Sequence, residues 1–135
     1  DFSLTEASGQ TSKLSAYFED NDYLVVDLSQ FYCEPCKNLA RSKQSDTKFQ
    51  ASMQKGVCKL LTLVNSRELS SWVGAFPTST FVGKASRGVS NTGSFSSAFG
   101  MTLAATPTVM VIDRKGKTVA TAVGQLPPQV ASLCK

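Results

Sequence analysis

Two cysteines, Cys33 and Cys36, stand three residues apart in the sequence Cys33-Glu34-Pro35-Cys36. They follow an apolar run over residues 23–28 that is typical of a buried strand, and a helix is expected to start at Pro35. A thiol at a helix N-terminus faces unpaired N–H groups and the positive end of the helix dipole, which favour its thiolate. Cys33 is therefore the candidate nucleophile of a thiol–disulfide exchange. Cys36 is the candidate resolving thiol, since it can attack the mixed disulfide that Cys33 forms.

Other roles of a CxxC pair stay open on the residues alone. Such a pair supplies half of a four-thiolate zinc site, and it also occurs as an inert structural disulfide. The sequence has no second CxxC, because Cys58 and Cys134 have an unrelated spacing. Cys58 falls on an expected central strand, where it is either a free buried thiol or the partner of Cys134. A Cys58–Cys134 bridge would pin the end of the chain to the sheet.

The absence of histidine from the sequence excludes whole classes of site. Ser-His-Asp and Cys-His nucleophile arrangements and His-bearing metal centres all require it. A dithiol exchange needs no bound cofactor, and we expect neither a cofactor nor a metal ion. The net charge is +4, but the basic residues are scattered apart from Arg114–Lys117, which has the composition of a turn. No basic stripe interleaved with aromatics is present, so we expect no nucleic-acid partner.

The elements that must position the two thiols form one expected domain over residues 1–135. Apolar runs predict buried strands over residues 23–28 and 57–64, and a hairpin of 109–112 with 117–123. Helices are expected from the CxxC to near Gly56, unless Asp46 starts a second segment, and over residues 66–73, 94–100 and 127–133. This alternation predicts an α/β fold, a central mixed sheet flanked by helices on both faces.

Two further segments complete the expected organisation. Phe2 and Leu4 alternate with polar residues, and a turn at Ser8-Gly9-Gln10 follows, so we expect an N-terminal extension that begins with a short strand. Serine and glycine are frequent between Pro77 and Ser97, which predicts a connecting excursion.

Four features of the sequence resemble the thioredoxin superfamily. They are Val26-Asp27 six residues before the first cysteine, the box Cys33–Lys37 with Leu39-Ala40 after it, Thr106-Pro107-Thr108 before a strand, and Asp113–Lys117 followed by Gly124. The N-terminal extension and residues 97–101 resemble its TlpA and ResA type of extracytoplasmic member. The resemblance covers nearly the whole chain and implies a thioredoxin-like fold.

The resemblance also implies roles for particular residues. Pro107 should be cis and lie against the CxxC, with Thr106 beside the substrate cysteine. Asp27 matches a buried acid that accepts a proton from the resolving cysteine through water. On the residues alone, Asp27 is also compatible with a surface-facing position at a strand end. We further expect substrate contacts from the residues around the thiols, Tyr32, Glu34 and Pro35.

The implied activity is that of a protein thiol–disulfide oxidoreductase. It would exchange disulfides with cysteine-containing client proteins and act as a reductant. Several members of this branch reduce apocytochrome c thiols. Three positions depart from the branch pattern, with Tyr32 in place of Trp, Leu39 in place of Glu and Arg41 in place of Pro. A disulfide isomerase or oxidase, and a non-catalytic binding module with a structural CxxC bridge, are the alternatives.

The same resemblance implies a setting for the chain. We expect a monomer in the periplasm or another extracytoplasmic compartment. It would exchange electrons with an upstream donor, either a membrane thiol–disulfide transporter or a thioredoxin-like protein. Because the sequence starts at Asp1 rather than at a methionine, a signal peptide or a membrane tether can precede it.

Overall fold

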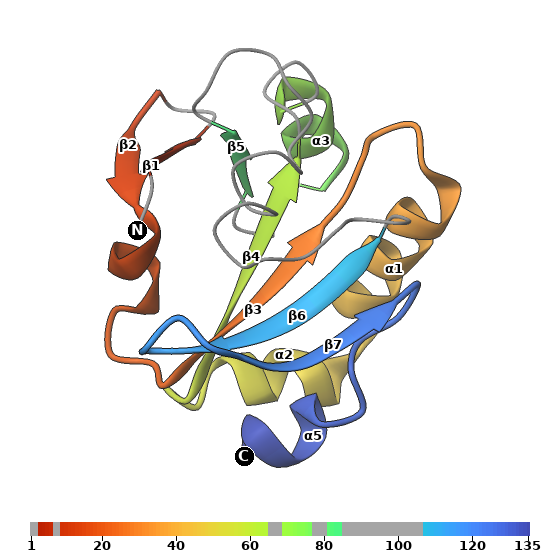
Figure 1. Cartoon of the computed structure of the whole chain (residues 1–135). Helices are drawn as coiled ribbons and strands as arrows, with labels where there is room; N and C mark the ends of the chain where they lie inside the picture. The colour runs from red at the N-terminus through yellow and green to blue at the C-terminus, as the bar shows by residue number, and fades with distance from the viewer. Residues whose placement is uncertain (1–2, 7–8, 65–68, 77–80, 85–106) are drawn as a thin grey trace.

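A computed structural model describes residues 3–6, 9–64, 69–76, 81–84 and 107–135 of the chain (Figure 1). Seven strands form one mixed sheet in the order β2-β1-β5-β4-β3-β6-β7. Their bounds are Ser3–Glu6 (β1), Thr11–Lys13 (β2), Tyr23–Leu28 (β3), Cys58–Val64 (β4), Phe81–Lys84 (β5), Thr108–Asp113 (β6) and Thr118–Val123 (β7). The predicted mixed sheet is therefore confirmed.

The centre of the sheet is strand β3, whose predicted bounds match the structure. It pairs in parallel with β4 and antiparallel with β6, and Leu28 at its end lies opposite Leu63 and Thr108. Residues 24–28 are buried on both faces of the sheet. A run of apolar residues without alternation is the pattern of such a doubly covered strand. Strands β6 and β7 form the predicted hairpin.

The excursion expected between Pro77 and Ser97 contains a strand that the sequence did not predict. Residues 81–84 form strand β5, which lies in parallel beside β4 and antiparallel to β1. Four residues are too few to show a period, and their β structure comes from pairing with two neighbouring strands rather than from local sequence. The predicted N-terminal strand is β1, which pairs with β2 as well as with β5. The predicted helix over 94–100 lies outside the described residues.

The helix after the CxxC breaks in two at Asp46. Helix α1 covers Glu34–Ser45, and helix α2 covers Thr47–Met53. Asp46 has an extended backbone (φ −82°, ψ 99°), and its carboxylate accepts a hydrogen bond of 3.0 Å from the Phe49 N–H. This is an N-cap, which satisfies a backbone donor at the start of α2. The second of the two expected arrangements, a restart at Asp46, is thus the observed one.

Helical segments cover both faces of the sheet. On one face of the sheet, helices α1, α2 and the short C-terminal α5 (Val130–Leu133) share an apolar cluster with the strands. This cluster is formed by Val25, Leu39, Phe49, Val109, Val111 and Val130. The 3-10 helix η1 (Leu14–Phe18) packs in a second cluster with Leu24, Val26 and Ile112 on the opposite face. Helix α3 (Leu69–Ala75) packs its buried Trp72 in a third cluster with Val64 and the start of α1. In the part of the chain that the structure describes, no helix has the length and apolar character to cross a bilayer.

Candidate functional site

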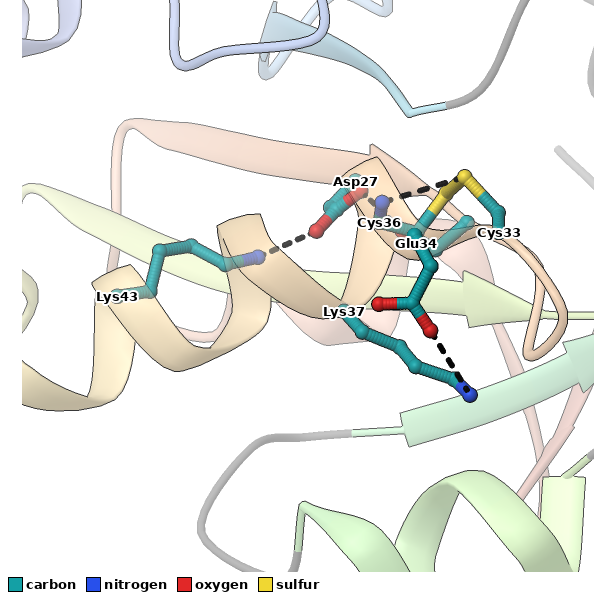
Figure 2. Close-up of a disulfide and its surroundings, with 7 residues drawn as sticks. Asp27, Cys33, Glu34, Cys36, Lys37 and Lys43 are labelled. Atoms are coloured by element: carbon teal, nitrogen blue, oxygen red, sulfur yellow. Dashed lines mark hydrogen bonds and ion pairs between the residues drawn. A yellow bond between two sulfur atoms is a disulfide. The ribbon is translucent and has the colours of Figure 1, made fainter.

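The two CxxC cysteines form a disulfide at the start of α1, just beyond the end of the central strand (Figure 2). Their Cα atoms lie 5.2 Å apart. Cys33 is the N-cap of the helix, and Pro35 stands in its first turn, where a missing N–H costs nothing. The Cys36 N–H donates a hydrogen bond of 3.2 Å to Cys33 Sγ. The backbone thus places a donor on the first sulfur, where it would stabilise a thiolate.

The two sulfurs differ in access to solvent. Cys36 is completely buried in the cluster with Ala40, Val64 and Trp72, whereas Cys33 is only partly buried at the edge of that cluster. A bulky disulfide of another protein can approach the first sulfur and cannot reach the second. This asymmetry matches the roles expected of an attacking and a resolving cysteine.

Aromatic and charged side chains surround the exposed side of the bridge. Tyr32 is 88% exposed, and its ring meets that of Phe31 edge to face at 5.4 Å. Lys37 Nζ lies 4.4 Å from the centre of the Phe31 ring and 3.8 Å from a carboxylate oxygen of the exposed Glu34 (Figure 2). Lys37 therefore offsets part of the negative charge that Glu34 brings near the sulfurs. Pro35 is also exposed.

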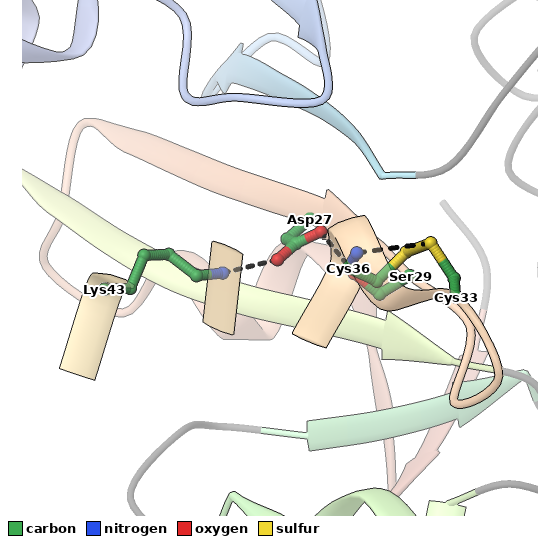
Figure 3. Close-up of polar contacts among 5 residues, drawn as sticks. All are labelled: Asp27, Ser29, Cys33, Cys36 and Lys43. Atoms are coloured by element: carbon green, nitrogen blue, oxygen red, sulfur yellow. Dashed lines mark hydrogen bonds and ion pairs between the residues drawn. A yellow bond between two sulfur atoms is a disulfide. The ribbon is translucent and has the colours of Figure 1, made fainter. Parts of the chain in front are cut away.

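Asp27 lies inside the protein, fully excluded from solvent, so the alternative of a surface-facing strand end is wrong. Both of its carboxylate oxygens have a donor (Figure 3). Ser29 Oγ donates to Oδ1 at 2.6 Å, and the ammonium group of Lys43 forms an ion pair with Oδ2. Lys43 is itself buried, with a side chain only 4% exposed.

Sequence reasoning missed both partners of Asp27. The signal for Lys43 was its position, because Cys36, Ala40 and Lys43 recur at intervals of four and three residues on one helix face. All three are buried, so this face packs against the interior. A lysine on an apolar helix face requires a buried counter-ion, and Asp27 was the acid available on the neighbouring strand. Ser29 carried no comparable signal.

Pro107 is buried immediately before strand β6, whose first residue Thr108 lies opposite Leu28 at the end of β3. The Pro107 carbonyl accepts a hydrogen bond of 2.7 Å from the N–H of Gly124, whose φ of 80° suits glycine. Pro107 therefore lies at the same end of the sheet as the loop that leads to Cys33. Thr106 is outside the described residues, and the cis bond expected at Pro107 stays a prediction.

The other two cysteines form a second disulfide at the far end of the sheet. Cys58 opens strand β4 opposite Tyr23, and Cys134 follows α5, with the two Cα atoms 5.3 Å apart. Both cysteines are fully buried. Of the two alternatives for Cys58, the structure has the bridge rather than the free thiol. Within the described ranges no three His, Cys, Asp or Glu side chains gather as a metal site would require.

Residues 1–134 match the family model described as Redoxin. The chain belongs to the Redoxin family. Membership confirms the resemblance drawn from the CxxC, and it makes this Redoxin-family chain a thioredoxin-like oxidoreductase. The sequence has no significant match among curated proteins.

Solved structures with the same fold are numerous, at low sequence identity. A thioredoxin-like protein from Bacteroides caccae superimposes with a TM-score of 0.70 at 18% identity over 91% of this chain, which spans 43% of that protein. The thioredoxin domain of a thiol-disulfide oxidoreductase from Bacteroides vulgatus gives 0.70 at 16% identity, covering 96% of this chain and 86% of that one. The exposed lipoprotein thioredoxin Etrx1 of Streptococcus pneumoniae gives 0.67 at 20% identity, covering 98% and 93%. These structures confirm the thioredoxin-like fold.

Proposed function

We propose that this Redoxin-family chain exchanges disulfides with protein clients through Cys33 and Cys36, and that it acts as a reductant. The observation that carries the proposal is the unequal access of the two sulfurs at the N-terminus of α1, with Cys36 fully buried and Cys33 at the surface edge. An inert staple has no need of this difference. An exchange cycle requires unequal access, because one sulfur must be reached by the client disulfide while the other is shielded from it.

The reaction starts from the reduced dithiol. The Cys33 thiolate attacks one sulfur of a client disulfide, so a mixed disulfide forms and the other client sulfur leaves as a thiolate. Cys36 then loses its proton and attacks Cys33 Sγ, which breaks the mixed disulfide and releases the second client thiolate. Two electrons pass from Cys33 and Cys36 to the client, whose thiolates take protons from water. The product is the bridge present in the structure.

Asp27 is proposed to accept the proton of Cys36 through water during the second step. Its burial on the strand that leads into the CxxC loop supports this role. Thr106 and Pro107 are proposed to orient the incoming client, and the position of Pro107 at the CxxC end of the sheet supports that assignment. Tyr32, Glu34 and Pro35 are proposed to line the contact, because all three are exposed around the bridge.

The proposed clients are proteins with disulfides outside the cytoplasm. A second, buried disulfide fits an oxidising compartment, since such bonds are rare in reducing ones. The similarity to an exposed lipoprotein thioredoxin supports the same setting. We propose that an upstream thiol–disulfide partner returns the chain to its reduced form. The chain is proposed to work as a monomer. Apocytochrome c would be one specific client. No feature of the described residues favours it over other cysteine-containing proteins.

Replacement of each active cysteine tests the proposal. We expect Cys33→Ser to abolish reduction of insulin disulfides, and Cys36→Ser to accumulate mixed disulfides that mass spectrometry assigns to Cys33. The matched control is Cys58→Ala/Cys134→Ala, which removes the distant bridge and should leave turnover intact. Unchanged insulin turnover in Cys33→Ser would overturn the proposal.

A redox titration separates the alternatives. Thiol trapping across graded buffers should give the Cys33–Cys36 couple a potential of about −270 mV, as expected of a reductant. A value of about −120 to −180 mV would identify an oxidant or isomerase instead. A bridge that resists reduction below about −300 mV would identify a binding module with a structural CxxC.

A further inference from the structure

An exposed aromatic ring stands immediately before the attacking cysteine. Three large apolar side chains are exposed in the described part of the chain, and Tyr32 at 88% is far more exposed than Val123 at 56% or Val119 at 38%. The Tyr32 ring meets Phe31 edge to face, a contact that leaves most of its surface open to solvent. Tyrosine is enriched in protein interfaces, where its ring supplies a large and rigid contact area. The ring is therefore available to a client that approaches Cys33.

An exposed carboxylate stands on the other side of Cys33. The Glu34 side chain is 71% exposed, and Lys37 Nζ lies 3.8 Å from one of its oxygens. That distance is longer than a hydrogen bond, so the Glu34 carboxylate can still accept hydrogen bonds from an incoming group. Tyr32 and Glu34 are the two chain neighbours of Cys33, and their Cα atoms lie about 3.8 Å from its own. A long client side chain beside the reacting sulfur can reach both residues.

The protein already holds one cation between an aromatic ring and this carboxylate. Lys37 Nζ lies 4.4 Å from the centre of the Phe31 ring and within ion-pair distance of Glu34 (Figure 2). The Lys37 side chain is only 20% exposed, so most of it is sheltered from an incoming client. A ring beside the CxxC and the Glu34 carboxylate can therefore share one cation. Tyr32 supplies a second ring for the same arrangement, this time open to solvent.

We propose that Tyr32 and Glu34 select client disulfides that carry an arginine close to the reacting cysteine; this inference rests on the proposed function. The client guanidinium stacks on the Tyr32 ring and donates hydrogen bonds to the Glu34 carboxylate. Arginine suits both contacts better than lysine, because its guanidinium is planar, more weakly hydrated and able to donate two parallel hydrogen bonds to one carboxylate. The exchange steps are unchanged, and the arginine acts on the encounter with Cys33.

The expected preference is moderate because both contacts lie at the surface. An exposed cation–π contact and an exposed ion pair are each worth about two- to fivefold in binding. Lys37 competes for the Glu34 carboxylate and lowers the second contribution. Together they predict a preference of about fivefold. An arginine two positions from the client cysteine faces the same side of an extended client chain as that cysteine, so this position is the one to test.

The test compares client peptides that differ in one side chain. Each client is the disulfide-linked dimer of a short peptide with arginine, citrulline or glutamate two positions before its cysteine. Citrulline keeps the shape of arginine without its positive charge. The reduced full chain is mixed with each dimer, and the second-order rate of peptide-thiol release is followed by chromatography. We expect the arginine dimer to react about fivefold faster than the citrulline dimer, and the glutamate dimer to react more slowly than both.

Variants assign this preference to the two residues. The measured quantity is the ratio of the arginine rate to the citrulline rate, in which any general effect on the reactivity of Cys33 cancels. Glu34→Gln and Tyr32→Leu should each lower the ratio by about twofold. Lys37→Met should raise it, because the Glu34 carboxylate loses its partner within the chain. Lys48→Met removes an exposed lysine from helix α2 and should leave the ratio unchanged.

The outcomes separate this inference from the proposed function. A ratio near one in the unmodified chain overturns the selection of arginine, while reduction of the citrulline dimer at the same time leaves the exchange cycle standing. An unchanged ratio in both Glu34→Gln and Tyr32→Leu also overturns it, because the arginine would then be recognised elsewhere. If the unmodified reduced chain reduces neither the three dimers nor insulin, the proposed function itself is overturned.

Discussion

Removal of the distant disulfide by Cys58→Ala/Cys134→Ala should cost far more stability than removal of the active bridge. The two cysteines are separated by 76 positions in the sequence. Closing a loop of that length lowers the entropy of the unfolded chain by about 15 cal/mol/K, which corresponds to about 4.5 kcal/mol of folding free energy. For the separation of 3 between Cys33 and Cys36, the same relation gives about 1.6 kcal/mol.

Unfolding in guanidinium chloride measures both costs, with Cys33→Ala/Cys36→Ala as the matched control. The larger loss should also lower the melting temperature by about 15 °C in a chain of this size. Of the four cysteines removed in the two double variants, only Cys33 is partly exposed, so the comparison mainly reports the effect of loop length. A cost for Cys58→Ala/Cys134→Ala no greater than that of the control would refute the reasoning. Insulin turnover by this variant should persist below its melting temperature.

Two other substitutions test the packing around the site. Asp46→Ala removes the N-cap of α2 and should lower the free energy of unfolding by about 1 kcal/mol, measured by urea denaturation with Asp46→Asn as the conservative control. Asp27→Asn leaves the Lys43 ammonium buried without its counter-ion and should cost about 3–5 kcal/mol. The double change Asp27→Asn/Lys43→Met should recover most of that loss in the same assay, and a double variant as unstable as the single one would contradict this account.

The sequence was most informative where local chemistry and tertiary structure agree. Residues 23–28 have apolar side chains on both faces, and the observed strand has the same bounds. The helix after Cys36 follows from its N-terminal proline, and the restart at Asp46 follows from a residue that caps well. The two active cysteines could be predicted from their spacing and from their position after a strand alone.

What could not be predicted depends on contacts between distant segments. Strand β5 exists because β4 and β1 flank it, and β1 lies more than 70 residues earlier in the chain. Lys43 could be identified as the partner of Asp27 only once it was known that α1 turns its Cys36 and Lys43 face toward the sheet. The pairing of Cys58 with Cys134 was one of two alternatives until the end of the chain was placed against β4.

The position of Cys134 also constrains the order in which the chain can be oxidised. During synthesis or export from the N-terminus, Cys33, Cys36 and Cys58 all emerge well before Cys134, with strands β6 and β7 in between. Throughout that interval, the correct partner of Cys58 is missing, while two reactive thiols are already present. Any early bridge from Cys58 is therefore a wrong one that must later be exchanged. Correct oxidation of this chain therefore requires that Cys58 stay reduced until Cys134 has emerged, or that its early bridge be exchanged afterwards.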